Sequence, residues 1–207
     1  MKEYEYYMWP RGKSMNICIY GASSDKLARE YFEAAEKLGA LMARGGHRLV
    51  FGGGQGGLMG ACARGVSGEK GELTGIAPRF FDEPGVLYPH CTRFLFTDTM
   101  RERKAAMEQE AEAFILLPGG IGSFEEFFET LTLKQLGRHT KPIAILNTLG
   151  YYNDMYAMLK KTSAEGFMSE SCLDLFSLCD TPEQALDNVL HAEKTGGSIK
   201  RLSDYHR

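Results

Sequence analysis

Two glycine-rich loops constrain this chain more than any other feature, because each follows a short apolar run and precedes a helical pattern. The first loop covers residues 51–60 with the sequence FGGGQGGLMG, and the second covers residues 117–126 with the sequence LPGGIGSFEE. Residues without a Cβ atom let a ligand approach backbone N–H groups directly. The N-terminus of the following helix adds further donors and the positive end of the helix dipole. Two such loops in one small chain predict a site for a nucleoside monophosphate or a similar phosphorylated sugar.

Strand and helix patterns alternate along the chain. Apolar runs predict strands at residues 16–20, 47–51, 73–77, 92–97, 113–117 and 142–147. Helical spacing predicts a helix after the second loop and others at residues 26–44, 58–66, 100–112, 151–164 and 182–194. Asp25 is expected to cap the first helix, and Thr99 with Glu102 has the spacing of a capping box. The alternation predicts an α/β fold with a doubly wound parallel sheet between two helical layers, which is a three-layer sandwich.

Length and composition favour a single domain. Without an internal repeat or a low-complexity linker, we expect an N-terminal extension over residues 1–13, one nucleotide-binding domain over residues 14–194 and a C-terminal tail over residues 195–207. The formal net charge of -3 gives no basic field of the kind that binds a nucleic acid polymer. No apolar run approaches the length of a membrane span, and residues 1–13 lack the apolar stretch of a signal peptide.

The cysteines and histidines predict neither disulfides nor a metal site. The five cysteines form no CxxC motif and are interpreted as reduced thiols of a cytoplasmic protein. The five histidines show no HxxxH or HExxH spacing. We therefore expect no metal and no cofactor.

The two glycine loops are expected at one edge of the sheet, where the carboxyl ends of parallel strands meet and ligands bind. The first loop contains GxGxxG, but it follows the second strand, and it lacks both a ribose-binding acid at the usual spacing and the Walker lysine. A tight turn without a ligand is the alternative interpretation, and the presence of two loops at one edge favours ligand binding. The candidate ligand contacts are Gly21 and Ser23 after the first strand, Gly53, Gly54 and Met59 in the first loop, and Gly119, Gly120, Ile121, Gly122 and Ser123 in the second.

Glu126 has two interpretations from the residues alone. Ser123 and Glu126 have the spacing of a capping box, with Ser123 as the N-cap residue. Alternatively, Glu126 lies off the phenylalanine stripe of its helix, near the loop that is expected to hold the ligand. A carboxylate there could stabilise an oxocarbenium-like centre or activate water, and the helix N-terminus is expected to lower its pKa. The residues support capping and catalysis equally.

Arg101, Arg103 and Lys104 begin the helix that follows the strand at residues 92–97. An isolated cluster of this kind is usually a solvated charged face. Cations at a helix N-terminus oppose the helix dipole, however, and these also follow the carboxyl end of a strand. The placement favours a contact with a phosphate or a purine edge.

The ordered motifs GGGQGGLMG, MRERK, PGGIGSFEE and KQLGRHTKP resemble those of the Lonely Guy family of cytokinin riboside 5′-monophosphate phosphoribohydrolases, which are often mislabelled lysine decarboxylases. The resemblance runs from about residue 16 to about residue 180. It implies a Rossmann-like fold, usually dimeric, and hydrolysis of the N-glycosidic bond of a nucleoside 5′-monophosphate to free base and ribose 5-phosphate. It also implies that Arg103 and Glu126 are catalytic and that Lys104, beside Arg103, contacts the substrate.

Two positions depart from the family pattern. Ser123 stands where the family has Thr, which preserves a hydroxyl group. Arg101 stands where the family usually has His, which bears on substrate preference rather than on reaction type. The resemblance favours a catalytic role for Glu126, and that role is compatible with capping.

The helix after the second loop carries more apolar residues than one core stripe needs, which favours a homodimer. These residues are Phe127, Phe128, Leu131, Leu133 and Leu136. We therefore expect a homodimeric, metal-independent hydrolase of purine or cytokinin nucleoside monophosphates. The alternative is a nucleotide-binding or carrier protein of the same fold that lacks turnover, and the intact Arg103 and Glu126 argue against it.

Overall fold

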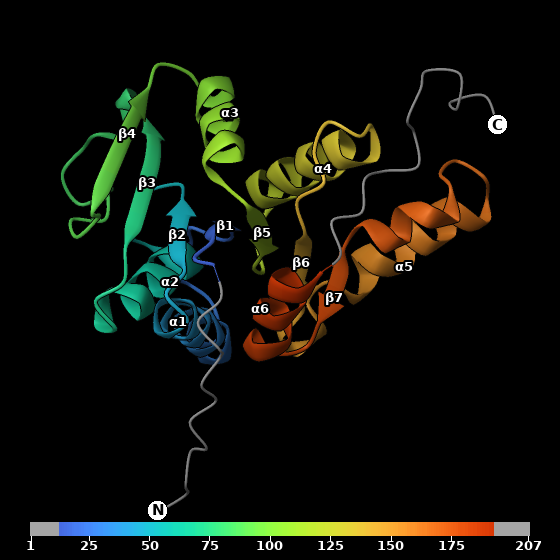
Figure 1. Cartoon of the computed structure of the whole chain (residues 1–207), viewed down its shortest axis with the longest axis horizontal. Helices are drawn as coiled ribbons and strands as arrows, with labels where there is room; N and C mark the ends of the chain where they lie inside the picture. Colours follow the sequence, from blue (N-terminus) through green and yellow to red (C-terminus); the bar gives the residue numbers. More distant parts are fainter. Residues whose placement is uncertain (1–12, 193–207) are drawn as a thin grey trace, which may run out of the picture.

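Seven parallel strands form one sheet in the computed structural model, which describes residues 13–192 (Figure 1). Their order across the sheet is β4-β3-β2-β1-β5-β6-β7. Their bounds are β1 Asn16–Tyr20, β2 Arg48–Phe51, β3 Leu73–Pro78, β4 Arg93–Thr97, β5 Ala113–Leu116, β6 Ile143–Leu146 and β7 Ser177–Cys179. In register, Ile19 of β1 lies between Phe51 of β2 and Ile115 of β5. The predicted doubly wound parallel sheet is confirmed, with its switch point between β1 and β5.

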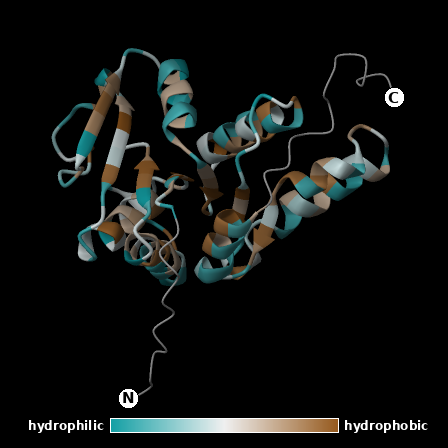
Figure 2. Ribbon diagram, in the orientation of Figure 1, coloured by the Kyte–Doolittle hydropathy of each residue, from teal (hydrophilic) through white to brown (hydrophobic). Residues whose placement is uncertain are grey.

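Helices cover both faces of the sheet, so the predicted three-layer arrangement is also confirmed. On one face lie α1 Arg29–Arg44, α2 Gly57–Gly68 and α6 Pro182–His191; on the other lie α3 Met100–Glu110, α4 Ile121–Gln135 and α5 Asn153–Ala164 (Figure 1). The period-two alternation of β1 divides the core, because Ile17 and Ile19 pack with the first group and Cys18 and Tyr20 with the second. Figure 2 shows hydrophobic residues on the central strands and hydrophilic ones over much of α3.

Strand β7 was not among the strands predicted from the sequence. It has only three residues and follows the 3₁₀ helix η3 Glu170–Leu175, so it is too short for a periodic pattern to stand out. Two further 3₁₀ helices, η1 Arg79–Phe81 and η2 Thr148–Gly150, follow β3 and β6. The predicted extension at residues 1–13 and the tail at 195–207 lie outside the described residues, except for Lys13.

The helix starts confirm one predicted cap and contradict another. At α3 the Glu102 N–H donates to Thr99 Oγ1 at 3.2 Å, and the Thr99 N–H donates to the Glu102 carboxylate, which completes the predicted capping box. The predicted cap of α1 by Asp25 is wrong, because α1 begins at Arg29. The Asp25 carboxylate instead accepts the Gly57 N–H of α2 at 2.7 Å, so a donor distant in sequence replaced the local one.

Glycines let α1 and α2 approach closely enough for their backbones to touch. A Cβ atom on Gly39 of α1 would lie 2.1 Å from the Cys62 carbonyl oxygen, and one on Gly65 of α2 would lie 2.0 Å from the Glu36 carbonyl oxygen. Neither distance is compatible with a side chain. This contact fixes α2, and with it the first glycine loop, against the layer that contains α1.

We predict that Gly39→Ala lowers the free energy of unfolding by about 2 kcal/mol, because an overpacking cost of about 3 kcal/mol outweighs a helix-propensity gain of about 1 kcal/mol. Urea unfolding followed by circular dichroism measures the change. Gly68→Ala at the end of α2 is the matched control, since no atom lies within 4 Å of its Cβ position. Equal stability of the Gly39→Ala and wild-type proteins would contradict the close contact.

Candidate active site

The loop after β1 lies between the two glycine loops and is hydrogen-bonded to both. The Ala22 N–H donates to the Pro118 carbonyl at 3.0 Å, and the Leu58 N–H donates to the Ala22 carbonyl at 2.8 Å. A Cβ atom on Gly57, whose φ is +60°, would lie 2.2 Å from the same Ala22 oxygen. The predicted residues Gly21 and Ser23 therefore lie between the two glycine loops at the carboxyl edge of the sheet.

Arg103 and Glu126 form a buried ion pair at this edge. Arg103 comes from α3 and Glu126 from α4, and their side chains are each 8% exposed. Arg103 Nη1 donates to Glu126 Oε1 at 2.8 Å, and Arg103 Nε donates to the Ile76 carbonyl at the end of β3 at 3.3 Å. The structure thus brings together two side chains that are 23 residues apart in the sequence.

The Arg103 guanidinium also lies against the first glycine loop. A Cβ atom on Gly52 would lie 2.3 Å from Arg103 Nη2 and 3.4 Å from Met59 Sδ. Only glycine leaves space for the guanidinium at this position. Arg103 therefore connects the first glycine loop to the helix that follows the second.

The predicted capping box of Ser123 and Glu126 is wrong. Helix α4 begins at Ile121 with Gly120 as the N-cap residue, and no side chain caps it. Ser123 is buried inside the first turn, where its Oγ atom occupies the space that a Cβ atom on Gly119 would need. Because Glu126 lies more than one turn into the helix, its carboxylate reaches Arg103 rather than the helix N-terminus.

The expected lowering of the Glu126 pKa is also wrong. Burial raises the pKa of this carboxyl group above its ordinary value of 4.5, and the neighbouring Arg103 opposes the shift. The helix N-terminus has little influence this far along α4. A carboxyl group whose pKa is moved toward neutrality is suited to exchange protons in catalysis.

Lys104, predicted as a substrate contact, has carboxylate partners on α4. Its Nζ atom forms ion pairs with Glu125 and, at 2.5 Å, with Glu129. Together with the Arg103–Glu126 pair, these contacts tie α3 to α4 through adjacent residues. Arg101 is exposed at the start of α3.

Three backbone N–H groups of the first glycine loop are hydrogen-bonded within the protein. Gln55 donates to Val86, Gly57 to Asp25 and Leu58 to Ala22. Gly53 is buried with a φ of +76°, and Phe94 fills the space beside it. This loop therefore acts mainly as a packed wall of the site.

The second glycine loop presents its backbone openly. Between residues 13 and 192, the N–H groups of residues 120–123 have no hydrogen-bond acceptor, whereas the Gly119 N–H lies against the Tyr152 hydroxyl. No atom lies within 4 Å of a Cβ position on Gly120 or Gly122, and Ile121 is 86% exposed. Free N–H donors at the start of a 15-residue helix are suited to bind an anion.

Sequence analysis missed two tyrosines beside this loop. Tyr151 Oη donates to the Gly119 carbonyl at 2.8 Å, and Tyr152 Oη donates to the Leu117 carbonyl at 2.7 Å. The signal was available, because both residues follow the strand predicted at residues 142–147 and so belong to the same sheet edge.

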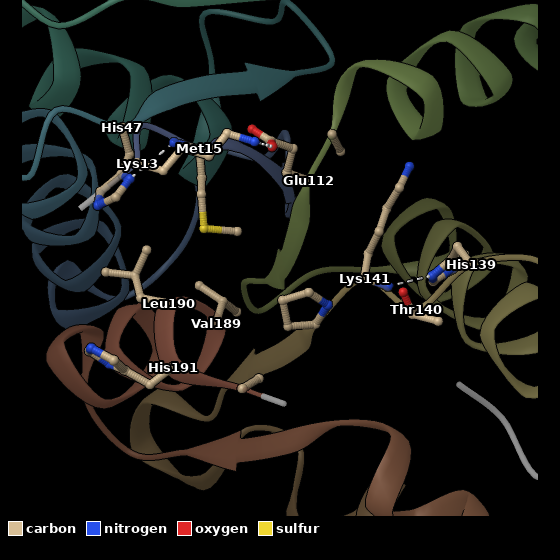
Figure 3. Close-up of a pocket in the computed structure, with 13 residues that line it drawn as sticks. Lys13, Met15, His47, Glu112, His139, Thr140, Lys141, Val189, Leu190 and His191 are labelled. Atoms are coloured by element: carbon tan, nitrogen blue, oxygen red, sulfur yellow. Dashed lines mark hydrogen bonds and ion pairs between the residues drawn. The ribbon is translucent and has the colours of Figure 1, made fainter. Parts of the chain in front are cut away.

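A cavity of about 580 Å³ lies at the opposite, amino-terminal edge of the sheet (Figure 3). Its lining includes Met15, His47, Glu112 and Pro142, which immediately precede strands or lie next to their first residues. None of the residues predicted for the nucleotide site lines it. Within residues 13–192 there is also no cluster of histidine, cysteine and carboxylate side chains that could hold a metal ion, and no helix long and apolar enough to cross a membrane.

Solved structures share this fold at low sequence identity. The molybdenum cofactor binding protein of Rippkaea orientalis has a TM-score of 0.66 and 18% identity, with 86% of this chain and 96% of that chain covered. The Moco carrier protein of Chlamydomonas reinhardtii has a TM-score of 0.65 and 19% identity, covering 86% and 96%. The fold is therefore Rossmann-like, as the resemblance implied.

Sequence relatives define the family. Residues 59–189 match the family profile described as possible lysine decarboxylase. A probable cytokinin riboside 5′-monophosphate phosphoribohydrolase of Oryza sativa subsp. japonica is 35% identical, with 86% of this chain and 79% of that protein covered. A cytokinin riboside 5′-monophosphate phosphoribohydrolase of Rhodococcoides fascians is 36% identical over 83% and 87%. The fold and site define a Rossmann-like protein with an open glycine loop beside a buried arginine–glutamate pair. The chain belongs to the family of those phosphoribohydrolases, the Lonely Guy family.

The raised pKa of Glu126 predicts a pH-dependent difference in stability between wild type and Glu126→Gln. The folded protein holds this proton more tightly than the unfolded chain does, so the contribution of Glu126 to stability is present below pH 4.5 and is lost as pH rises through the raised pKa. The variant cannot ionise at this position. The free energy of unfolding of Glu126→Gln, relative to wild type, should therefore increase as pH rises above 4.5.

Urea unfolding at several pH values tests this prediction. Glu129→Gln, which removes a half-exposed carboxylate from the same helix, is the control for the loss of a charge. A relative stability of Glu126→Gln that stays constant over the whole range would contradict a raised pKa.

Proposed function

We propose that this protein hydrolyses the N-glycosidic bond of a purine or cytokinin nucleoside 5′-monophosphate and releases free base and ribose 5-phosphate. The observation that carries the proposal is the juxtaposition of the buried Arg103–Glu126 pair with the open N-terminus of α4. The first can act on a glycosidic bond, and the second can hold a phosphate. The printed names of relatives at about 35% identity agree with this chemistry.

The 5′-phosphate would bind the loop formed by Gly119, Gly120, Ile121, Gly122 and Ser123. Its free N–H groups and the helix dipole both favour a dianion. Gly21 and Ser23 would contact the nucleotide from the neighbouring loop. Gly53, Gly54 and Met59 would form the wall beside the sugar and base, and Lys104, paired with Glu125 and Glu129, would hold α3 against α4 at the site.

Glu126 would face the ribose. Its carboxylate can stabilise positive charge on C1′ as the bond to the base nitrogen breaks, and it can accept a proton from the water that attacks C1′. The bond between C1′ and the nitrogen breaks, a bond between C1′ and the water oxygen forms, and the base leaves with a proton. Arg103 would hold Glu126 in place, favour its ionised form and bind the leaving base or the phosphate.

The preferred substrate, compartment and assembly are further parts of this proposal. AMP and its prenylated analogues are the nucleotides we expect to be hydrolysed. We place the reaction in the cytoplasm, in keeping with five cysteines that form no disulfide. A carrier without turnover is the alternative, and it draws support only from structures of low sequence identity.

Base release tests the function directly. The protein is incubated with AMP or with isopentenyladenine riboside monophosphate, and free base is measured by chromatography. We predict base release from the monophosphates at a kcat/KM at least about 100-fold above that for adenosine, because the nucleoside lacks the charge-assisted phosphate contacts. Equal rates for adenosine and AMP would contradict phosphate anchoring, and binding without base release would favour the carrier.

The role of Glu126 gives a separate prediction. Glu126→Gln keeps the size of the side chain and a hydrogen-bond acceptor for Arg103, but it removes the negative charge and the proton acceptor. Turnover should fall by roughly 100-fold or more. Glu129→Gln, one turn or less away on the same helix, is the matched control and should keep near-normal turnover. Similar turnover of Glu126→Gln and wild type would remove Glu126 from the mechanism.

A homodimer is the assembly that we propose. The apolar residues of α4 support a dimer less than the sequence suggested, because Phe127 and Leu131 of this helix are buried in the core. Apolar surface remains elsewhere, since Phe80, Phe81 and Phe96 are exposed between β3 and α3. We predict a dimer or a higher even assembly in sedimentation velocity at micromolar concentration, and a monomer under these conditions would contradict it.

A further inference from the structure

The second glycine loop has three successive carbonyl groups that all accept hydrogen bonds from other parts of the protein. The Leu117 carbonyl accepts from Tyr152 Oη, the Pro118 carbonyl from the Ala22 N–H, and the Gly119 carbonyl from Tyr151 Oη. Two of the three donors are adjacent side chains in the segment between β6 and α5.

The carbonyl contacts determine which way the loop's N–H groups point. In a planar trans peptide the C=O and the following N–H point in opposite directions. When Tyr151 holds the Gly119 carbonyl, the Gly120 N–H is directed the opposite way, toward the open start of α4. The preceding peptide differs, because its Pro118 carbonyl accepts from Ala22 and its Gly119 N–H lies against the buried Tyr152 hydroxyl rather than at the open start of α4.

The peptide between Gly119 and Gly120 is the one whose orientation depends most on such a contact. Glycine on both sides makes rotation of this peptide sterically easy. A rotated peptide would present a carbonyl oxygen, rather than an N–H, to a bound anion. The interaction with phosphate would then change from attraction to repulsion.

The segment that supplies both tyrosines is held in an unusual conformation. Leu149 has a φ of +54°, a left-handed value that is uncommon for a residue other than glycine, and its side chain is 67% exposed. Asn147 stabilises the turn, because its Oδ1 accepts the Tyr152 N–H at 2.7 Å and its Nδ2 donates to Asn153 at 2.8 Å. The turn places two consecutive side chains on the same loop.

The two tyrosines differ in their surroundings. Tyr152 is fully buried, and burial raises the pKa of its hydroxyl, which stays protonated as a donor. Tyr151 is 43% exposed and packs edge-to-face against Tyr31 of α1 and against Tyr152. Removal of the Tyr151 hydroxyl thus leaves its ring contacts intact.

We propose that Tyr151 is a positioning residue of the phosphate loop, whose hydroxyl keeps the Gly119–Gly120 peptide turned with its N–H toward the 5′-phosphate. Tyr152 anchors the same loop at Leu117. This inference rests on the proposed function, since it takes residues 119–123 as the phosphate site. It adds a residue that sets the preference for nucleoside monophosphates over nucleosides.

Calorimetric titration of the full-length protein with AMP and with adenosine tests the proposal. Tyr151→Phe should weaken AMP binding by about 10-fold, and adenosine binding should change by less than about 2-fold, because only the phosphate contact is lost. Tyr156→Phe is the matched control: it removes a hydroxyl from the first turn of α5, where the ring packs edge-to-face against Phe176, and both affinities should stay at wild-type values. Thermal melts check that all three proteins are folded.

Unchanged AMP affinity in Tyr151→Phe would overturn the proposal. Equal weakening of AMP and adenosine would also overturn it, because a general structural role would produce that result. If wild type binds adenosine as tightly as AMP, or binds neither, residues 119–123 are not a phosphate site and the proposal fails. Wild type that binds AMP in the predicted pattern but releases no base would reject the hydrolase and leave the role of Tyr151 supported.

Discussion

The buried ion pair between Arg103 and Glu126 joins the two halves of this protein. Arg103 lies on α3, which follows the edge strand β4, and Glu126 lies on α4, which follows β5 on the other side of the switch point. Removing two charges from water is costly, and apolar residues of similar volume would often serve stability as well or better. The pair is therefore better explained by what it does at the sheet edge than by what it adds to the fold.

The two glycine loops beside this pair use their backbone groups differently. Three N–H groups of the first loop donate to Asp25, Ala22 and Val86, and Gly52 leaves space for the Arg103 guanidinium. In the second loop the carbonyl groups of residues 117–119 are hydrogen-bonded, and the N–H groups of residues 120–123 are free within the described residues 13–192. The glycines of the first loop thus allow other parts of the protein to pack closely against it. In the proposed function, those of the second loop allow a ligand to do so.

The parts of this structure that follow from local patterns could be predicted from the sequence. Buried parallel strands such as Ala113–Leu116 read as continuous apolar runs, and strand–helix alternation places both glycine loops at one edge. The capping box at Thr99 could also be predicted, because both of its partners lie within three residues. Strand–helix alternation likewise predicted that Arg103 and Glu126, each on a helix that follows a strand, lie near this edge.

The errors arose where a distant partner replaced a local one. Asp25 and Glu126 both have the sequence context of helix caps, yet one binds Gly57 and the other binds Arg103. Local spacing cannot reveal such partners, and it cannot reveal the degree of burial that raises the pKa of Glu126. The tyrosines at 151 and 152 were overlooked because their effect is exerted through backbone carbonyls of a loop more than 30 residues away.

We propose that Arg103 and Glu126 act as one unit in hydrolysis. A double-mutant cycle on kcat/KM tests it most directly, with Arg103→Lys, Glu126→Gln and the combined variant assayed on the nucleoside monophosphate that wild type hydrolyses fastest. We predict that the combined variant is about as slow as the slower single variant, because either change already disables the pair. Losses that multiply in the combined variant would show two independent contributions and contradict the claim.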